Sequence, residues 1–281
     1  MKIAVSAETT VDLTEELKNR FDVKTTPFTV LLGDREAFDG EISPDEIFSF
    51  VEKNKILPKT SAVNEYQYTE HFTNLLKDYD AVIHLSLSSH LSSACQNAKS
   101  AAEKLSNVFV VDTLSLSTGI ALLAIFAREQ AQAGLSPQEI YNALNQRVKG
   151  VQASFALKRV DYLYKGGRCS AMAYLGANLL GIRPQIILKD GKMIAGKKYR
   201  GNYLKVINNY CRDVIDEYST PDLNHAFVTY TTADEQVVKT AVSYLEERGF
   251  KNIHVTRAGA TISSHCGEDC LGILYLNDKA N

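Results

Sequence analysis

Short apolar runs alternate with longer amphipathic segments along the first half of the chain. Runs of strand length that are rich in apolar and β-branched residues predict strands, at residues 2–6, 23–32, 80–85 and 107–111. Helix-forming residues fill the segments between them and predict helices, at residues 13–21, 64–79, 92–105 and 118–132. The last of these is nearly all apolar, which predicts burial on most sides. Because strands and helices alternate, we expect a parallel sheet with helices on both faces.

Local signals mark where some elements begin and end. Two runs combine a serine N-cap, a proline at the first helical position and a glutamate that returns to the cap, and these are Ser43-Pro44-Asp45-Glu46 and Ser136-Pro137-Gln138-Glu139. Asp12 with Glu15 predicts a similar start for the helix at 13–21. Pro58 excludes helix at the residue before it, so we expect Thr60 and Ser61 in a loop.

The second half begins a new series of elements after Gly150. Strands are predicted at residues 151–157, 183–188, 192–197, 226–230, 252–256 and 271–276, with a turn at Asp190-Gly191 that makes the second and third a hairpin. Helices are predicted at residues 160–165 and 203–218, and from Thr232 with Glu235 to Gly249. We therefore expect two α/β domains, 1–150 with a parallel sheet flanked by helices and 151–281 with a mixed sheet.

Composition narrows the function classes. With 45% hydrophobic and 23% charged residues, the chain can bury a sizeable core. The formal net charge is −2 and no long basic run is present, so nucleic acid is not an expected partner. No apolar run reaches the length of about 18 residues that spans a bilayer, and the first residues lack a signal-peptide core. We expect a cytoplasmic protein without a transmembrane segment.

The five cysteines are an odd number in a chain too long to need disulfides, so free thiols are expected. Cys266 and Cys270 lie near His265, but this spacing is a weak match to a zinc site. We expect no metal and no cofactor.

Five serines lie in residues 83–96, where a predicted strand runs into a predicted helix. The backbone N–H groups of a first helical turn, together with serine hydroxyls, can hold a carboxylate or a phosphate. Serine is also preferred at N-caps and turns in any protein. The turn is therefore either an anion-binding site or an ordinary helix start, in which Ser88, Ser89, Ser92 and Ser93 are only N-caps and turn residues.

Seven separated motifs occur in the order seen in the DegV family, which the chain resembles over nearly its whole length. They are Phe38-Asp39-Gly40, Pro58-Lys59-Thr60-Ser61, Ser88-Ser89-x-Leu-Ser92, Asp112-Thr113-x-Ser115, Leu163-Tyr164-Lys165-Gly166-Gly167-Arg168, Gly181-Ile182-Arg183-Pro184 and Ser264-His265-x-Gly267. Three stretches depart from the family pattern. Ser93-Ala94-Cys95 stands where Gly-Thr-Tyr is common, Glu268-Asp269 follows Gly267 where Pro-Gly is usual, and Glu8-Thr9 stands where Asp-Ser is common.

The resemblance implies a two-domain fold that binds one long-chain fatty acid and presents its carboxylate to a separate kinase subunit, itself similar to dihydroxyacetone kinase. That subunit uses ATP to make an acyl phosphate, so the chain itself is not expected to be an enzyme. Thr60, Ser92 and His265 would bind the carboxylate, with Ser61 and Ser93 as neighbours. Arg168 and Arg200 would face the kinase. Transient contact with a membrane surface is compatible with this role.

A fatty acid needs an apolar cavity for its tail, and each buried methylene contributes about 0.8 kcal/mol. Candidate walls are Met172, Leu175, Leu179, Leu180 and the helix at 120–126, although ordinary core is the more common role for any one of them.

Three other functions are alternatives, and the sequence argues against two of them. Ser92 and His265 could form a hydrolase site for a lipid-like ester, but no Gly-x-Ser-x-Gly turn is present and no carboxylate is obviously placed to orient the histidine. A nucleotide-binding kinase would need a phosphate-binding glycine motif, which the sequence lacks. The chain could also carry another amphiphilic acid.

Overall fold

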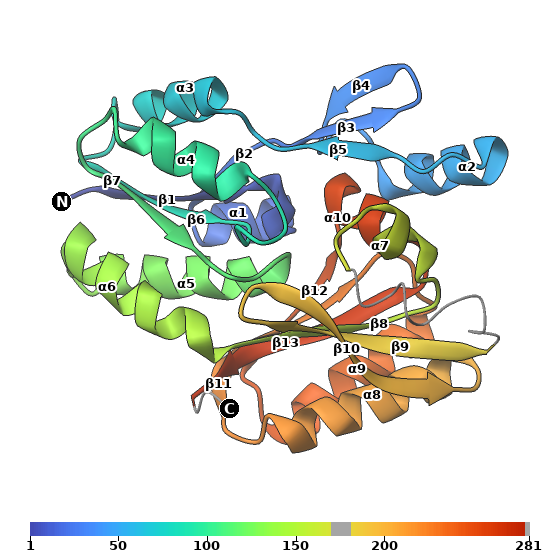
Figure 1. Ribbon diagram of the computed structural model, residues 1–281. Coiled ribbons are helices and arrows are strands. Elements are labelled where there is room, and N and C mark those ends of the chain that lie inside the picture. Colours follow the sequence, from blue (N-terminus) through green and yellow to red (C-terminus); the bar gives the residue numbers. More distant parts are fainter. Residues whose placement is uncertain (170–180, 279–281) are drawn as a thin grey trace.

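The computed structural model describes residues 1–169 and 181–278. Its first sheet is parallel throughout, with strand order β2-β1-β6-β7, and is built from β1 (Ile3–Glu8), β2 (Val23–Thr26), β6 (Ala81–Ser86) and β7 (Val108–Asp112). Two helices cover each face, α3 (Glu65–Leu75) and α4 (Ala94–Ala102) on one, α5 (Thr118–Gln132) and α6 (Pro137–Arg147) on the other (Figure 1). The predicted parallel sheet with helices on both faces is confirmed.

The second sheet is mixed, with strand order β10-β9-β8-β13-β11-β12. Its strands are β8 (Val151–Leu157), β9 (Ile182–Lys189), β10 (Lys192–Arg200), β11 (Pro221–Tyr230), β12 (Asn252–Arg257) and β13 (Cys270–Asn277). Helices α8 (Tyr203–Glu217) and α9 (Glu235–Arg248) cover its outer face, and α5 packs between the two sheets (Figure 1). This position explains why α5 is nearly all apolar and is buried along most of its length.

A third, three-stranded sheet was not predicted. It has strand order β4-β3-β5 and contains β3 (Thr29–Leu32), β4 (Arg35–Phe38) and β5 (Lys59–Ser61). The single strand predicted at 23–32 is wrong, because Pro27 lacks an N–H group and separates β2 from β3. The loop predicted for Thr60 and Ser61 is also wrong, since both belong to β5, which pairs with β3.

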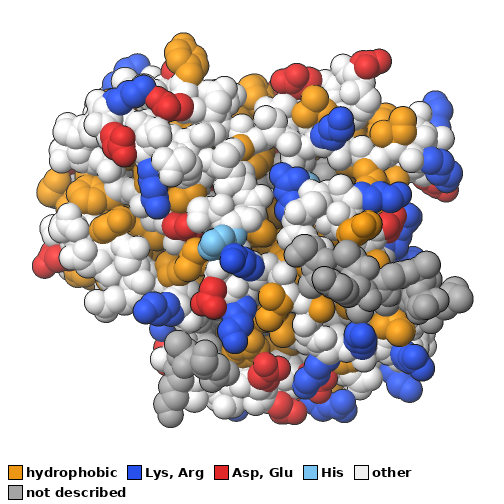
Figure 2. Space-filling view, in the orientation of Figure 1, with side chains coloured by type: hydrophobic (Ala, Val, Ile, Leu, Met, Phe, Trp, Pro, Cys, Tyr) orange, Lys and Arg blue, Asp and Glu red, His pale blue; other side chains and the backbone are white. Residues whose placement is uncertain are grey.

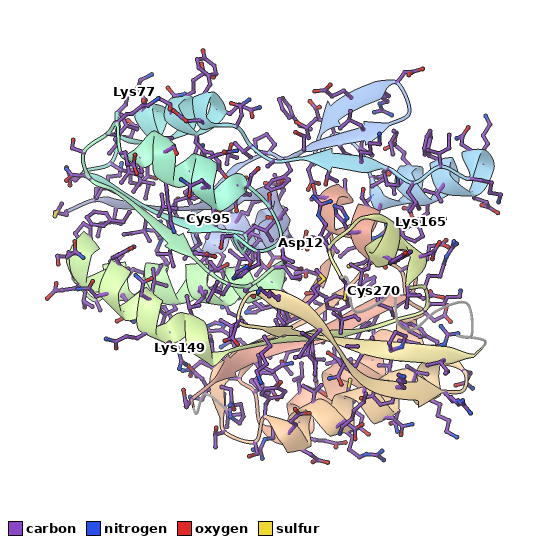
Figure 3. The ribbon with its side chains drawn as sticks, in the orientation of Figure 1. Asp12, Lys77, Cys95, Lys149, Lys165 and Cys270 are labelled. Atoms are coloured by element: carbon purple, nitrogen blue, oxygen red, sulfur yellow. The ribbon has the colours of Figure 1, made fainter. Side chains whose placement is uncertain are left out.

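Helix α10 (Ala260–Cys266) was also not predicted from the sequence. It packs against β3, β5, α2 (Pro44–Asn54) and α7 (Asp161–Lys165). Its first N–H groups bind carboxylates far away in the sequence. Asp12 Oδ1 accepts from Gly259 N at 2.7 Å, and Asp39 accepts from Ala260 N at 2.9 Å and from Thr261 N at 3.2 Å. Figure 3 shows Asp12 where the upper and lower parts of the molecule meet.

Two predicted caps were placed on the wrong residue. Thr14, and not Asp12, caps α1 (Glu15–Arg20), because Asp12 adopts a left-handed conformation after a short 3-10 helix (Thr9–Val11) and binds Gly259. Asp234 is the N-cap of α9, whereas Thr232 exchanges hydrogen bonds with Asp269. Both Ser-Pro capping boxes and the hairpin of β9 and β10 are confirmed. A second 3-10 helix (Val148–Gly150) precedes β8.

On the face shown in Figure 2, basic and acidic side chains are interspersed over the surface. Within residues 1–169 and 181–278, no helix is long and apolar enough to cross a membrane. All five cysteines are buried, and Cys95, Cys211, Cys266 and Cys270 are free thiols, as the sequence predicted.

Candidate ligand-binding site

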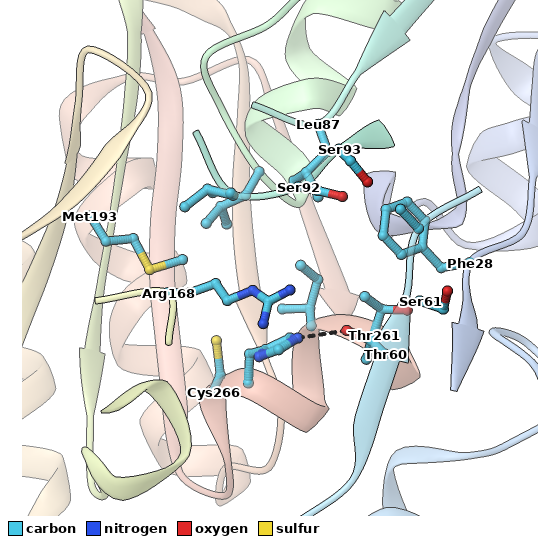
Figure 4. Close-up of a pocket in the computed structure, with 15 residues that line it drawn as sticks. Phe28, Thr60, Ser61, Leu87, Ser92, Ser93, Arg168, Met193, Thr261 and Cys266 are labelled. Carbon is cyan, nitrogen blue, oxygen red and sulfur yellow. Dashed lines mark hydrogen bonds between the residues drawn. The ribbon is translucent and has the colours of Figure 1, made fainter. Parts of the chain in front are cut away.

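A cavity of about 230 Å³ lies where the parallel sheet, the three-stranded sheet and α10 meet (Figure 4). Its polar walls come from β5, the serine turn after β6, the segment after α7, and α10, and they comprise Thr60, Ser61, Ser92, Ser93, Arg168, Thr261 and His265. Its apolar walls include Phe28, Ala62, Leu87, Leu91, Leu116, Met193, Ile262 and Cys266. The structure thus brings all five predicted carboxylate-binding residues to one cavity.

The serine turn lies at the carboxyl ends of β1 and β6, where the connections of a parallel sheet diverge and ligands commonly bind. Ser88 has a structural role there. Its buried hydroxyl donates to Gly191 O at 2.8 Å and accepts from His90 N at 3.3 Å. Asp112 Oδ1 accepts from Ser89 N at 3.2 Å. These bonds fix the path of the turn without using Ser92 or Ser93.

Ser92 combines the two roles that the sequence left open. Its Oγ accepts from Ala94 N at 3.2 Å, so it satisfies the first N–H of α4. A hydroxyl that accepts a backbone hydrogen bond still has its own hydrogen to donate. Ser93 is the N-cap residue by position, but its side chain makes no capping bond and is exposed. Ser92 is therefore the better placed of the two to bind a ligand.

Thr60 and His265 contact each other in the wall of the cavity. Thr60 Oγ1 and His265 Nε2 are 2.8 Å apart, joining β5 to the C-terminal end of α10. Burial, with a smaller contribution from the Arg168 guanidinium, lowers the pKa of His265 to about 4. The imidazole is consequently neutral at neutral pH.

The other ring nitrogen of His265 lies against Gly166, the first glycine of the Lys-Gly-Gly-Arg motif. His265 Nδ1 is buried and has no hydrogen-bond partner. A Cβ at Gly166 would lie only 2.8 Å from this nitrogen, so a glycine is required for the backbone to pass so close.

The two arginines predicted to face a kinase occupy different places. Arg168 is exposed at the edge of the cavity, points into it together with Ser92 and Thr60 (Figure 4), and donates to Gly166 O at 2.6 Å. Arg200 is the exposed last residue of β10 and does not border this cavity. The guanidinium of Arg168 therefore places a positive charge among the hydroxyls.

Thr261 borders the cavity and was not identified from the sequence. It lies on α10 four residues before His265, and side chains four apart share one face of a helix. That spacing is the signal that could have identified it, had the helix itself been predicted.

A second, narrower cavity of about 30 Å³ adjoins the first and shares Leu116, Ile262 and Cys266 with it. Its remaining walls are Ser117, Phe155, Thr229, Tyr230, Thr231, Ala258, Cys270, Gly272 and Leu274. Burial raises the pKa of the Cys270 thiol well above its usual range, so this thiol stays uncharged. The pair of cavities is thus polar at one end and mostly apolar at the other.

The described residues test only one of the predicted tunnel walls, the helix at 120–126. Met172, Leu175, Leu179 and Leu180 lie outside the described residues. The helix at 120–126 borders neither cavity, and the residues just before it, Leu116 and Ser117, do so instead.

The geometry does not favour a serine hydrolase. His265 Nε2 binds Thr60 rather than Ser92, and no carboxylate of the described residues accepts a hydrogen bond from His265 Nδ1. A catalytic triad needs both of those contacts. Within the described part of the chain, no group of three or more His, Cys, Asp or Glu side chains is arranged to hold a metal ion.

Comparison with known proteins identifies relatives along the full length. A Thermotoga maritima protein named "Fatty acid-binding protein" is 28% identical over 281 residues, covering 97% of this chain and 96% of the relative. A Thermus thermophilus structure, described as "Fatty Acid Binding of a DegV family Protein", is 26% identical with a TM-score of 0.91, covering 99% of this chain and 100% of the other.

A more distant structure has the same fold. The Streptococcus pneumoniae "Fatty Acid Kinase (Fak) B3 protein loaded with linoleic acid" is 18% identical with a TM-score of 0.84, covering 99% of this chain and 100% of the other. The family model described as "Uncharacterised protein, DegV family" matches residues 2–278. Because this match spans nearly the whole sequence, the chain belongs to the DegV family.

Proposed function

We propose that the chain binds one long-chain fatty acid, with the carboxylate in the hydroxyl-lined cavity and the tail in the adjoining apolar cavity. The observation that carries this proposal is the convergence of Thr60, Ser92 and His265 on a cavity that becomes apolar at one end. Relatives named for fatty acid binding, at 26% and 28% identity over nearly the full length, support the same ligand class.

The polar groups suit an acceptor-only head group. A carboxylate has two oxygens that accept hydrogen bonds and none that donates. In the tautomer that we assign, neutral His265 donates from Nε2 to Thr60, which leaves the Thr60 hydroxyl hydrogen for the ligand. Ser92 donates in the same way while it accepts from Ala94 N. Arg168 contributes a positive charge from the exposed edge.

The tail supplies most of the affinity, because each methylene buried from water contributes about 0.8 kcal/mol. The apolar cavity measures about 30 Å³, far below the roughly 300 to 1,000 Å³ of a typical ligand pocket. Binding must therefore separate the side chains of α10 from those of β13, since both elements line this cavity. We expect acyl chains to enter slowly and to stabilise the protein strongly once bound.

The carboxylate then serves as the nucleophile for a separate, ATP-dependent kinase subunit. A carboxylate oxygen attacks the γ-phosphorus of ATP, the bond to the β-phosphate oxygen breaks, and acyl phosphate and ADP form. Arg168 and Arg200, both exposed, face the kinase in this proposal. A cytoplasmic location and brief contact with a membrane surface, where fatty acids are found, belong to the same proposal.

Native mass spectrometry of the chain purified from a bacterial host tests the lipid-binding step. We expect one added mass of a long-chain fatty acid per chain, and we expect the bound fraction to fall in a Thr60→Val, Ser92→Ala double variant. Turnover of a lipid-like ester would instead favour a hydrolase. If the chain retained a different amphiphilic acid, that acid would be the ligand in place of a fatty acid. Protein that stays empty after incubation with fatty acids would refute the proposal.

A further inference from the structure

Thr261 is the most deeply buried hydroxyl of the polar cavity, with an exposed fraction of 3%. Its Oγ1 is inaccessible to solvent and has no hydrogen-bond partner. A buried hydroxyl without a partner is unfavourable and uncommon in native proteins. Thr60 and Ser92, by contrast, are half-buried and each already makes a hydrogen bond.

The backbone of Thr261 is held in place, so its side chain cannot easily turn to another partner. Asp39 accepts hydrogen bonds from Ala260 N and from Thr261 N, and this fixes the first turn of α10. A β-branched side chain in a helix has few rotamers. Thr261 therefore stays in the wall of the cavity whether or not a ligand is bound.

We infer that the Thr261 hydroxyl donates a hydrogen bond to the carboxylate of the bound fatty acid, as a third hydroxyl beneath Thr60 and Ser92. This inference rests on the proposed function. A carboxylate offers about four lone-pair sites, so the two outer hydroxyls leave capacity on its inner oxygen. The N–H groups of Gly259, Ala260 and Thr261 cannot serve this purpose, because Asp12 and Asp39 already bind them.

The arrangement makes the site selective for acids. A primary alcohol of the same chain length has one oxygen and carries its own hydrogen, so it cannot accept from Thr60, Ser92 and Thr261 together. The loss of the Thr261 hydroxyl should therefore weaken binding of the acid much more than binding of the alcohol.

The chain offers a matched control. Thr10 is also fully buried and its Oγ1 also lacks a hydrogen-bond partner, but Thr10 borders neither cavity. Delipidated wild type, Thr261→Val and Thr10→Val are compared by melting temperature without ligand and by affinity for a long-chain fatty acid and its matching alcohol. Both variants should melt at or above the wild-type temperature, because each removes an unsatisfied buried hydroxyl.

In the binding assay, Thr261→Val should lower the affinity for the acid by about tenfold, as expected for one hydrogen bond to a charged group. Affinity for the alcohol should change by less than about twofold, and Thr10→Val should change neither affinity. Thr261→Ser, which keeps the hydroxyl, should restore the wild-type affinity for the acid.

Wild-type affinity of Thr261→Val for the acid would overturn the inference and leave the proposed function standing. If Thr261→Ser were as weak as Thr261→Val, the methyl group rather than the hydroxyl would be responsible, and the inference would again be wrong. If wild type itself failed to bind the acid, the proposed function would fail first. Thr261→Ala replaces Thr261→Val if the latter does not fold, with the same expected loss.

Discussion

The hydrogen bond between Thr60 Oγ1 and His265 Nε2, 2.8 Å long, joins two side chains that are 205 residues apart in the sequence. Thr60 belongs to the three-stranded sheet near the N-terminal half, and His265 belongs to the last helix of the chain. The polar cavity therefore exists only when these two parts are packed together. Any substitution that loosens α10 should change both stability and ligand affinity.

The neutral state of His265 predicts a specific response to acid. Its pKa is lowered from 6.5 to about 4, so folding favours the uncharged ring. The resulting contribution to stability is present above pH 6.5 and is lost as the pH falls through 4. His265→Gln should therefore lose less melting temperature between pH 7 and pH 4.5 than the wild type does. His90→Gln, at an exposed histidine, is the control and should follow the wild type.

Ser92 and its neighbour Ser93 give a paired test of the cavity hydroxyls. Ser92→Ala removes the acceptor for Ala94 N and should lower the free energy of unfolding by about 1 kcal/mol. It should also weaken fatty acid binding by about tenfold. Ser93→Ala removes an exposed side chain without a capping bond and should change either quantity little. Denaturant titration and ligand titration of both variants check this, and equal effects of the two would contradict it.

The elements that were predicted correctly have their signals within a few residues. The capping boxes of α2 and α6 are complete inside four consecutive residues, Ser43 to Glu46 and Ser136 to Glu139. Helix α10 has no such signal, because its capping carboxylates come from positions 221 and 247 residues away. A contact of that kind forms only after the fold exists. The short β5 was missed for the same reason, since its pairing with β3 is what makes it a strand.

Only part of the candidate site could be predicted from the sequence. Thr60, Ser92, His265 and Arg168 were identified through a series of ordered motifs, and they border one cavity; their roles toward a ligand stay predictions. Thr261 was missed because a threonine at the start of an unpredicted helix has no local feature that sets it apart. Of the predicted apolar walls, only the helix at 120–126 lies in the described residues, and its packing between the sheets keeps it away from both cavities.

Replacing Asp39 tests how strongly α10 depends on the N-terminal part of the chain. In Asp39→Asn, one carboxylate oxygen becomes an NH₂ group that faces a backbone N–H, so one buried donor is left unsatisfied. We expect a loss of about 1 to 3 kcal/mol in the free energy of unfolding, together with weaker fatty acid binding. Asp45→Asn is the control, because its exposed ion pair with Arg257 also bridges the two parts and should contribute less than about 1 kcal/mol. Equal losses in both variants would argue against a special role for Asp39.

The raised pKa of Asp12 predicts a loss of stability at alkaline pH. Burial, opposed by hydrogen bonds from Ser117 and Gly259 N, raises the pKa of this carboxyl from 3.8 to about 8. The folded state therefore favours the protonated form, and its contribution to stability decreases as the pH rises from about 4 through 8. Asp12→Asn stays neutral, can accept from Gly259 N, and can donate to Ser117. The wild type should lose more unfolding free energy than Asp12→Asn between pH 6 and pH 9, and parallel pH curves would contradict this.

The two arginines separate lipid binding from the proposed transfer step. Arg168 is exposed at the edge of the cavity, and exposed charge pairs contribute little to affinity in water. Arg168→Ala should therefore change fatty acid affinity by less than about threefold. Acyl-phosphate formation with the kinase subunit should fall by at least about tenfold, because phosphoryl transfer depends on cations that stabilise the transferring group.

Arg200→Ala should likewise change fatty acid affinity little, because Arg200 does not border the cavity at all. It should also lower acyl-phosphate formation, as Arg168→Ala does. Lys77, an exposed cation far from the cavity (Figure 3), provides the control, and Lys77→Ala should affect neither measurement. Ligand titration reports the first quantity, and ADP release with mass spectrometric detection of the acyl phosphate reports the second. If Arg168→Ala abolished lipid binding, its guanidinium would be a carboxylate ligand and only Arg200 would remain as a candidate contact for the kinase.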